Sequence, residues 1–348
     1  MPKISVIIPV YNVEKYIRQA LDSVVNQTLQ DIEIICINDC TPDNSFEIVK
    51  EYVSKDSRFV LLEQETNQGQ GVARNRALDI ATGEYIMFLD PDDWFELDAC
   101  EKAYNQISKN KNEIVFFNLY IQKEKKWGYK SSISKRINDF GLVLDNQHLK
   151  LADLDMIQLP AAWTWCQIYS RNFLNKNNIR YSNERFLEDL HFFIKAWINS
   201  KDVSILNEPL YNYRKTKTKT FDYASYFEHV LSSKEKAYLL ICESENKIAF
   251  LKQFTPYRIK SDIHWLRTFS RSNKKIRKDF YNRIKTTFEK IQKEFSQEII
   301  IEHNKYEDFL LITKCNSWEE YRLKRILRKI LKIITFQLKK RNFINAAK

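Results

Sequence analysis

The sequence predicts an α/β fold in which a mostly parallel central sheet is flanked by helices and followed by a helical C-terminal extension. In the first ninety residues, short apolar runs alternate with stretches whose apolar residues recur at helical spacing, as in a parallel sheet with helical crossovers. After residue 214 the chain becomes lysine-rich and keeps only the helical spacing. Its 348 residues, 44% of them hydrophobic, suffice for one large α/β domain and a smaller unit.

The sequence predicts the strands and helices of this fold in the following chain order. The expected strands of the first half are the apolar runs Ile4–Ile8, Ile32–Ile37, Phe59–Leu62 and Tyr85–Leu89. The expected helices between them are Glu14–Asn26, one that Asp43 or Asn44 caps, and Val72–Ala81, which closes near Gly83. Further along, strands are expected at Ile114–Phe117, Val203–Leu206 and Pro209–Tyr213, with a helix from Phe186 to about Trp197.

We therefore divide the chain into residues 1–214 and 215–348. The first part has a half of about 1–95 and a half of about 96–214. The second part is helical and basic, and it ends in an amphipathic helix at about 320–341. The apolar face of that helix holds Leu323, Ile326, Leu327, Ile330, Leu331, Ile334 and Leu338.

The net charge and its distribution along the chain narrow the kinds of partner that the protein could bind. The net charge of +11 is compatible with nucleic acid, anionic lipid or phosphate-bearing ligands. No acidic residue lies between Tyr321 and Arg341, so much of the charge sits on the terminal helix, and no nucleic-acid recognition module is present. We expect no nucleic-acid partner. The terminal helix could bind an anionic membrane surface, dock on the protein's own core, or contact another subunit.

The sequence contains neither a signal peptide nor a run long enough to span a membrane, so we expect a cytoplasmic protein, with a peripheral position on the inner face of the plasma membrane still open. Its six cysteines are scattered without a zinc-type spacing, which is typical of reduced cysteines in a cytosolic chain.

Polar residues follow the predicted strands where ligands bind in open α/β sheets. Asn12 follows the first strand, Asp39 the second, and Asp90, Asp92 and Asp93 the fourth. The first strand lacks the Gly-x-Gly-x-x-Gly loop that would hold a diphosphate on a helix N-terminus. A hard cation held by the aspartates could neutralise a diphosphate instead.

Each of these residues has a simpler interpretation. Asp90 to Asp93 could be an ordinary acidic turn, and Asp39 could cap the next turn rather than meet a ribose. Arg74 could lie on a solvated helix face or meet an anion at the first turn after a glycine loop. The negative charges of Glu188 and Asp189 could simply interact favourably with the dipole of the helix that these residues begin.

Taken together, ordered motifs resemble the family 2 glycosyltransferases, an inverting family with the Rossmann-like GT-A fold. They span about residues 3 to 214 and are Ser5-Val-Ile-Ile-Pro-Val-Tyr-Asn12, Ile37-Asn-Asp39, Asn67-x-Gly69, Ala73-Arg-Asn75, Gly83-Glu-Tyr-Ile-Met-Phe-Leu-Asp-Pro-Asp-Asp93 and Glu188-Asp189.

The resemblance implies that the half of about 1–95 binds the nucleotide sugar and that the half of about 96–214 binds the acceptor and carries the catalytic base. It also implies roles position by position. Near the base and ribose it places Pro9, Tyr11, Asn12 and Asp39, with Glu14 nearby. Arg74 would lie near the base or diphosphate. Asp92 would ligate Mn or Mg, with Asp90 contacting the sugar nucleotide and sharing the metal. Asp189 would be the general base that an inverting transfer requires, because an acceptor hydroxyl must lose its proton as it attacks.

The implied function is metal-dependent transfer of a sugar from a nucleotide sugar, by default a UDP-hexose or UDP-N-acetylhexosamine. The acceptor would be a glycan or lipid-linked oligosaccharide of a surface polysaccharide, lipooligosaccharide or glycoprotein glycan. The alternative is a non-enzymatic protein that binds carbohydrate or anionic surfaces on a decayed transferase fold. Residues whose roles stay open are Trp163 and Trp165, either core or acceptor-stacking; His229, a weak candidate metal ligand; and Arg214 to Lys219, a lid or a linker.

Overall fold

The computed structural model describes residues 1–124, 129–133, 164–215, 226–269, 274–294 and 311–327. By their internal contacts the residues fall into two compact units. One comprises Met1–Phe221 and Glu228–Phe250, and the other comprises Asp222–Phe227 and Leu251–Lys348. The first unit extends beyond the boundary expected after residue 214, because it also contains most of helix α8 (Phe227–Glu243).

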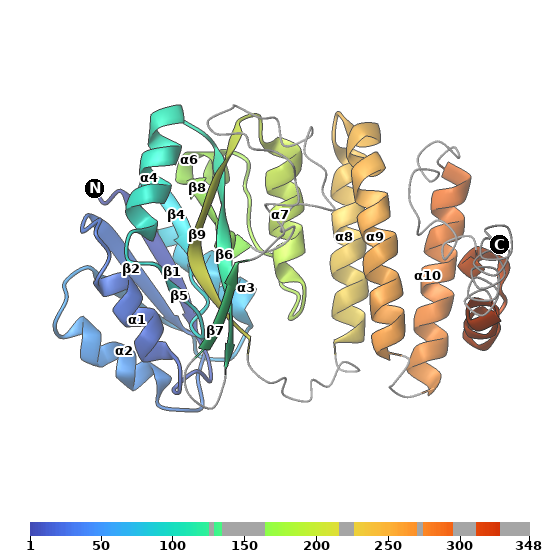
Figure 1. Ribbon diagram of the computed structural model, residues 1–348, viewed down its shortest axis with the longest axis horizontal. Helices are drawn as coiled ribbons and strands as arrows, with labels where there is room; N and C mark the ends of the chain where they lie inside the picture. Colours follow the sequence, from blue (N-terminus) through green and yellow to red (C-terminus); the bar gives the residue numbers. More distant parts are fainter. Residues whose placement is uncertain (125–128, 134–163, 216–225, 270–273, 295–310, 328–348) are drawn as a thin grey trace, which may run out of the picture. The chain divides into compact units, whose positions relative to one another are not determined.

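The first unit is built on a mixed sheet (Figure 1). In the described residues its order is β3-β2-β1-β4-β8-β6-β9-β5, with β7 beside β6. The strands are β1 (Ile4–Val10), β2 (Ile32–Asn38), β3 (Phe59–Glu63), β4 (Tyr85–Phe88), β5 (Trp94–Phe95), β6 (Ile114–Glu124), β7 (Tyr129–Ile133), β8 (Gln167–Ser170) and β9 (Val203–Lys215).

The predicted α/β class is confirmed, and the parallel part lies where the sequence predicted it. β1 pairs in parallel with β2 and β4, and β2 with β3. The other half is mixed, because β8 runs antiparallel to both β4 and β6 while β6 and β9 are parallel. β1 is buried along its whole length, which explains why its sequence is apolar at every position except Ser5 rather than alternating.

Helices cover both faces of this sheet. In Figure 1, α1 (Ile17–Val25), α2 (Ser45–Val53) and α4 (Ala99–Asn110) lie on one side, and α7 (Glu188–Asn199) lies on the other. α3 (Gln70–Ile80) contacts β1 and β2, and the short α6 (Arg171–Lys176) contacts β8. This arrangement places the N-termini of α3 and α7 near the carboxyl end of β4, where the candidate site lies.

Several element boundaries differ from the prediction, among them the end of β6, which extends to Glu124 rather than Phe117. Two of the differences have local reasons. The first helix begins at Ile17 rather than Glu14, because the Glu14 backbone N–H donates to Asp43 Oδ2 at 3.0 Å and its carboxylate accepts from Asn44. The two strands expected between 203 and 213 are one strand, β9, whose register against β6 shifts around Asn118.

The second unit is helical. Its described helices are most of α9 (Lys247–Phe269), α10 (Lys274–Glu294) and short segments at 311–314 and 318–327. Residues 318–327 open the predicted terminal amphipathic helix, and the rest of it lies outside the described residues. Across the ranges given above, no helix is both long and apolar enough to span a membrane.

Candidate active site

The turn after β4 gives its three aspartates different environments. Asp93 points inward and is 1% exposed; it accepts the Tyr211 hydroxyl at 2.8 Å and the Arg214 backbone N–H at 2.7 Å. Burial, together with the charges of Asp92 and Asp90, raises the pKa of Asp93 well above its usual value. Asp90 and Asp92 remain half-buried at the edge. Asp93 therefore holds the turn in place, whereas the other two carboxylates lie at the surface of the site.

Arg214, at the end of β9, fixes the same turn from the other side. Its Nε–H donates to the Asp92 carbonyl at 2.6 Å, and one terminal nitrogen donates to Gln19 Oε1 at 2.6 Å. The guanidinium lies between the rings of Tyr16 and Trp94, 4.8 and 4.7 Å from their centroids. At 4% exposure, Arg214 is part of the core under the turn, so the expectation of a lid or linker is wrong for this residue.

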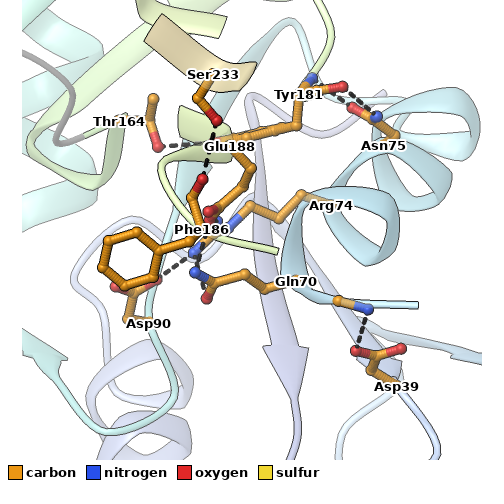
Figure 2. Close-up of polar contacts among 11 residues, drawn as sticks. Asp39, Gln70, Arg74, Asn75, Asp90, Thr164, Tyr181, Phe186, Glu188 and Ser233 are labelled. Atoms are coloured by element: carbon orange, nitrogen blue, oxygen red, sulfur yellow. Dashed lines mark hydrogen bonds and ion pairs between the residues drawn. The ribbon is translucent and has the colours of Figure 1, made fainter. Parts of the chain in front are cut away.

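Arg74 connects the turn to the acidic pair of α7 (Figure 2). Its Nη2 lies 2.5 Å from Asp90 Oδ1 and its Nη1 lies 3.2 Å from Glu188 Oε1. The guanidinium also lies 5.1 Å from the centroid of the Tyr181 ring, and Gln70 donates to Glu188 at 2.6 Å. Arg74 is 2% exposed, which excludes the solvated helix face.

Asp189 follows Glu188 at the start of α7 and is half-buried. No other residue in the described part of the chain hydrogen-bonds to its carboxylate. Burial and the charges of Glu188 and Asp90 raise its pKa well above the usual value, although Arg74 opposes them. A carboxylate with a raised pKa and no competing partner is suited to accept a proton.

The start of α7 packs tightly on α3 at a glycine. A Cβ on Gly71 would lie 2.8 Å from the Ser182 carbonyl and 2.9 Å from Glu188 Cγ. Because a side chain would not fit, Gly71 allows the first turn of α3 to reach Glu188. The sequence predicted the glycine loop, but it did not predict the contact of Gly71 with Ser182 and Glu188.

Asp39 organises the loop before α3. Its Oδ1 accepts the Gln68 N–H at 2.8 Å and the Gln64 side-chain amide at 2.6 Å, while Oδ2 accepts the Gly69 N–H at 2.9 Å. Asp39 is 2% exposed, and Gly69 has a φ of 92°. The Asp39 carboxylate thus accepts hydrogen bonds from the backbone N–H groups of this loop, as a helix-capping side chain does. Its predicted contact with a ribose stays a prediction.

The residues after β1 lie at the same edge. Pro9 is buried within the strand, Tyr11 is 45% exposed, and Asn12 is exposed with a φ of 54°. The Asn12 N–H donates to Thr41 Oγ1 at 2.8 Å. Glu14 instead lies against the N-terminus of α2, where it accepts from Asn44. Tyr11, Asn12 and Glu14 are thus exposed, whereas Pro9 is not.

The described residues contain no group of three or more His, Cys, Asp or Glu side chains arranged to hold a metal ion. Asp90 and Asp92 fit a different donor set, in which Mn or Mg takes one or two carboxylates and completes its shell with phosphate oxygens and water. His229 lies 2.7 Å from Glu184, away from this pair.

Sequence reasoning did not find the structural partners of the site. Trp165 is buried and stacks on Tyr211, with centroids 4.4 Å apart, while Trp163 lies outside the described residues. No catalytic or binding role was assigned from the sequence to Tyr211, Gln70 or Glu188. The spacing of Gln70 and Arg74, four residues apart on one helix, was the available signal for their shared contact with Glu188.

Comparisons with known proteins address the family and the fold of the chain. Residues 5–177 match the family described as "Glycosyl transferase family 2". The chain is 34% identical over 217 residues to "Glycosyltransferase GlyA" of Streptococcus pneumoniae, covering 61% of this chain and 30% of that protein. It is 32% identical over 217 residues to "Poly(ribitol-phosphate) beta-glucosyltransferase" of Bacillus spizizenii, covering 61% of this chain and 32% of that one. The chain thus spans about a third of the length of these two relatives.

Among solved structures, the 1–349 fragment of S. aureus TarS in complex with UDP has a TM-score of 0.68 and covers 92% of both chains at 20% identity. A likeness at this identity establishes the fold alone.

Proposed function

Because this chain carries a glycosyl transferase family 2 domain, we propose that it is a metal-dependent, inverting glycosyltransferase that moves a sugar from a nucleotide sugar to a hydroxyl of a glycan or lipid-linked acceptor. The observation that carries the proposal is the Arg74 link. It joins Asp90, on the turn after β4, to Glu188, the residue before Asp189. Two acidic sites with different environments are thereby held together.

The two sites support different steps. Asp189 accepts the proton of the acceptor hydroxyl as that oxygen attacks the anomeric carbon. Its raised pKa and lack of a hydrogen-bonding partner among the described residues favour that role. Asp90 and Asp92 face the leaving group, with Asp90 kept in position by Arg74. The base and the leaving-group site are therefore on different elements, α7 and the turn after β4.

Asp90 and Asp92 would hold Mn or Mg. When bound, such an ion neutralises the diphosphate as it leaves. The residues of this chain orient the two carboxylates: Arg74 holds Asp90, Arg214 holds the Asp92 carbonyl, and Asp93 anchors the turn between them.

The names of relatives narrow the substrates. TarS is solved with UDP and with UDP-GlcNAc, and a relative is named for glucosyl transfer to poly(ribitol-phosphate). We therefore propose a UDP-hexose or UDP-N-acetylhexosamine as donor and a bacterial surface glycan as acceptor. The direct test is a panel of nucleotide sugars screened for release of free nucleotide with and without Mn. A chain that binds carbohydrate on a decayed fold would release none.

The terminal helix supports a further partner, an anionic membrane surface. Leu323 and Leu327 are 59% and 49% exposed, so the apolar face does not dock on its own unit where the helix is described. Basic residues on the opposite face complement anionic lipid.

We expect the full chain to sediment with vesicles containing phosphatidylglycerol and a chain truncated after Cys315 to remain in the supernatant. Vesicles of phosphatidylcholine alone serve as the control for charge. Equal sedimentation of the two chains would refute the membrane role of this helix.

A further inference from the structure

The turn from Ser182 to Leu187, which we name the base turn, leads directly into Glu188 and Asp189. Its last residue, Leu187, has a φ of 55° and a ψ of 30°, the left-handed region that side chains other than glycine and asparagine rarely adopt. A strained residue of this kind persists only where its surroundings hold it. The direction in which α7 starts, and with it the position of Asp189, therefore depends on what holds the base turn.

A polar stripe on α8 contacts this turn. Glu184 Oε1 accepts the Ser232 hydroxyl at 2.5 Å and the Lys236 ammonium at 2.6 Å, and its Oε2 lies 2.7 Å from His229 Nδ1. One position beyond Ser232, the Ser233 hydroxyl donates to the Phe186 carbonyl at 2.9 Å, a contact drawn in Figure 2. Residues 229, 232, 233 and 236 share one face of a helix, so the stripe is continuous.

The opposite side of the turn is joined to the loop that Asp39 organises. Two terminal nitrogens of Arg185 donate to Asn67, one to its side-chain oxygen and one to its carbonyl, each at 2.8 Å. The Asn67 amide in turn donates to the Asp39 carbonyl at 3.1 Å. The side chains of adjacent residues of the base turn thus make opposite attachments, Glu184 to α8 and Arg185 to the loop before α3, while the Arg185 backbone N–H donates to His229 Nδ1 on α8 at 3.3 Å.

We propose that Glu184 is a positioning residue for Asp189, and that helix α8 acts through it to hold the base at the candidate active site. This inference rests on the proposed function. Glu184 is 12% exposed in its side chain, and its hydrogen bonds from Lys236, Ser232 and His229 outweigh burial and lower its pKa to about 2. It is therefore charged at neutral pH and keeps all three partners there.

The test compares Glu184→Ala with Glu235→Ala, which removes from α8 an exposed carboxylate that has no partner among the described residues. We expect Glu184→Ala to lower kcat about tenfold or more, since displacement of a catalytic group by about 1 Å has effects of this size, while the donor KM changes by less than about twofold. Glu235→Ala should match the wild-type chain. Ser233→Ala, which removes only the bond to Phe186, should lower kcat in the same direction.

A rescue separates positioning from general damage. Asparagine tolerates the left-handed region better than leucine, so Leu187→Asn should restore much of the lost kcat in the Glu184→Ala background. A Glu184→Ala chain with wild-type kcat, or a loss that Glu235→Ala reproduces, would overturn the proposal.

A wild-type chain without transferase activity would instead defeat the proposed function, and the positioning is then measured by hydrogen exchange of residues 182–190. Faster exchange in Glu184→Ala than in Glu235→Ala supports it, and equal exchange overturns it.

Discussion

Asp189→Asn should lower kcat for sugar transfer by about a thousandfold, within the range for loss of a general base, while nucleotide-sugar binding changes little. The asparagine keeps the shape of the side chain but cannot accept the acceptor proton. Binding is spared because the donor contacts are expected at the β1 and β4 ends, whereas Asp189 lies on α7. Steady-state kinetics with calorimetry of donor binding would measure both quantities.

The pH profile gives an independent check. A base acts only when deprotonated, and burial together with Glu188 raises the pKa of Asp189. In the wild-type chain, kcat should therefore fall as pH drops through a pKa above that of an ordinary aspartate, and the variant should lose this dependence. The substitution should not lower Tm, because the fold already disfavours the charge that it removes. Unchanged kcat in Asp189→Asn would reject the assignment of the base.

Arg74→Met should lower the free energy of unfolding by about 3 kcal/mol or more, since removing one member of a buried ion pair leaves the other charge uncompensated. The side chains of Arg74 and Glu188 are 3% and 5% exposed, so water cannot replace the lost partner. Urea unfolding would measure the change. The variant should also lose activity, because Asp90 loses the contact that holds it.

Two further variants separate charge from packing. Arg76 lies on the same helix as Arg74 and is exposed, so Arg76→Met should change the free energy of unfolding by less than about 0.5 kcal/mol. Adding Glu188→Gln to Arg74→Met should recover part of the loss, because it removes the stranded carboxylate. If the single variant were as stable as Arg76→Met, the buried link would not hold the two acidic sites together.

The parallel half of the fold could be predicted from sequence because the features that specify each of its strands and helices lie within that element. Buried strands such as Tyr85–Phe88 appear as short apolar runs, and the helices between the strands keep a clear 3.6-residue period. β5 and β8 are two and four residues long, too short for a periodic signal, and they run antiparallel through pairings with distant β9, β4 and β6. Nothing in their own residues specifies those partners.

The same division applies to the site. Position after a strand brought Asp39 and Asp90 to the correct edge. It could not reveal that Asp93 faces inward, that Arg214 lies beneath the turn 122 positions away from Asp92, or that Arg74 reaches Glu188 across 114 positions. Such contacts depend on how the mixed half of the sheet folds back. The fold therefore shows which residues support the site, whereas the sequence identified carboxylates that follow the strands.

The most direct test of the account is the Mn-dependent release of nucleotide from the best UDP-sugar of the panel, compared between the wild-type chain and Asp92→Ala. We expect release by the wild-type chain that stops when Mn and Mg are chelated and returns when Mn is added, and no metal-dependent release by Asp92→Ala. An Asp92→Ala chain that releases nucleotide at the wild-type rate, with the same dependence on Mn, would contradict it.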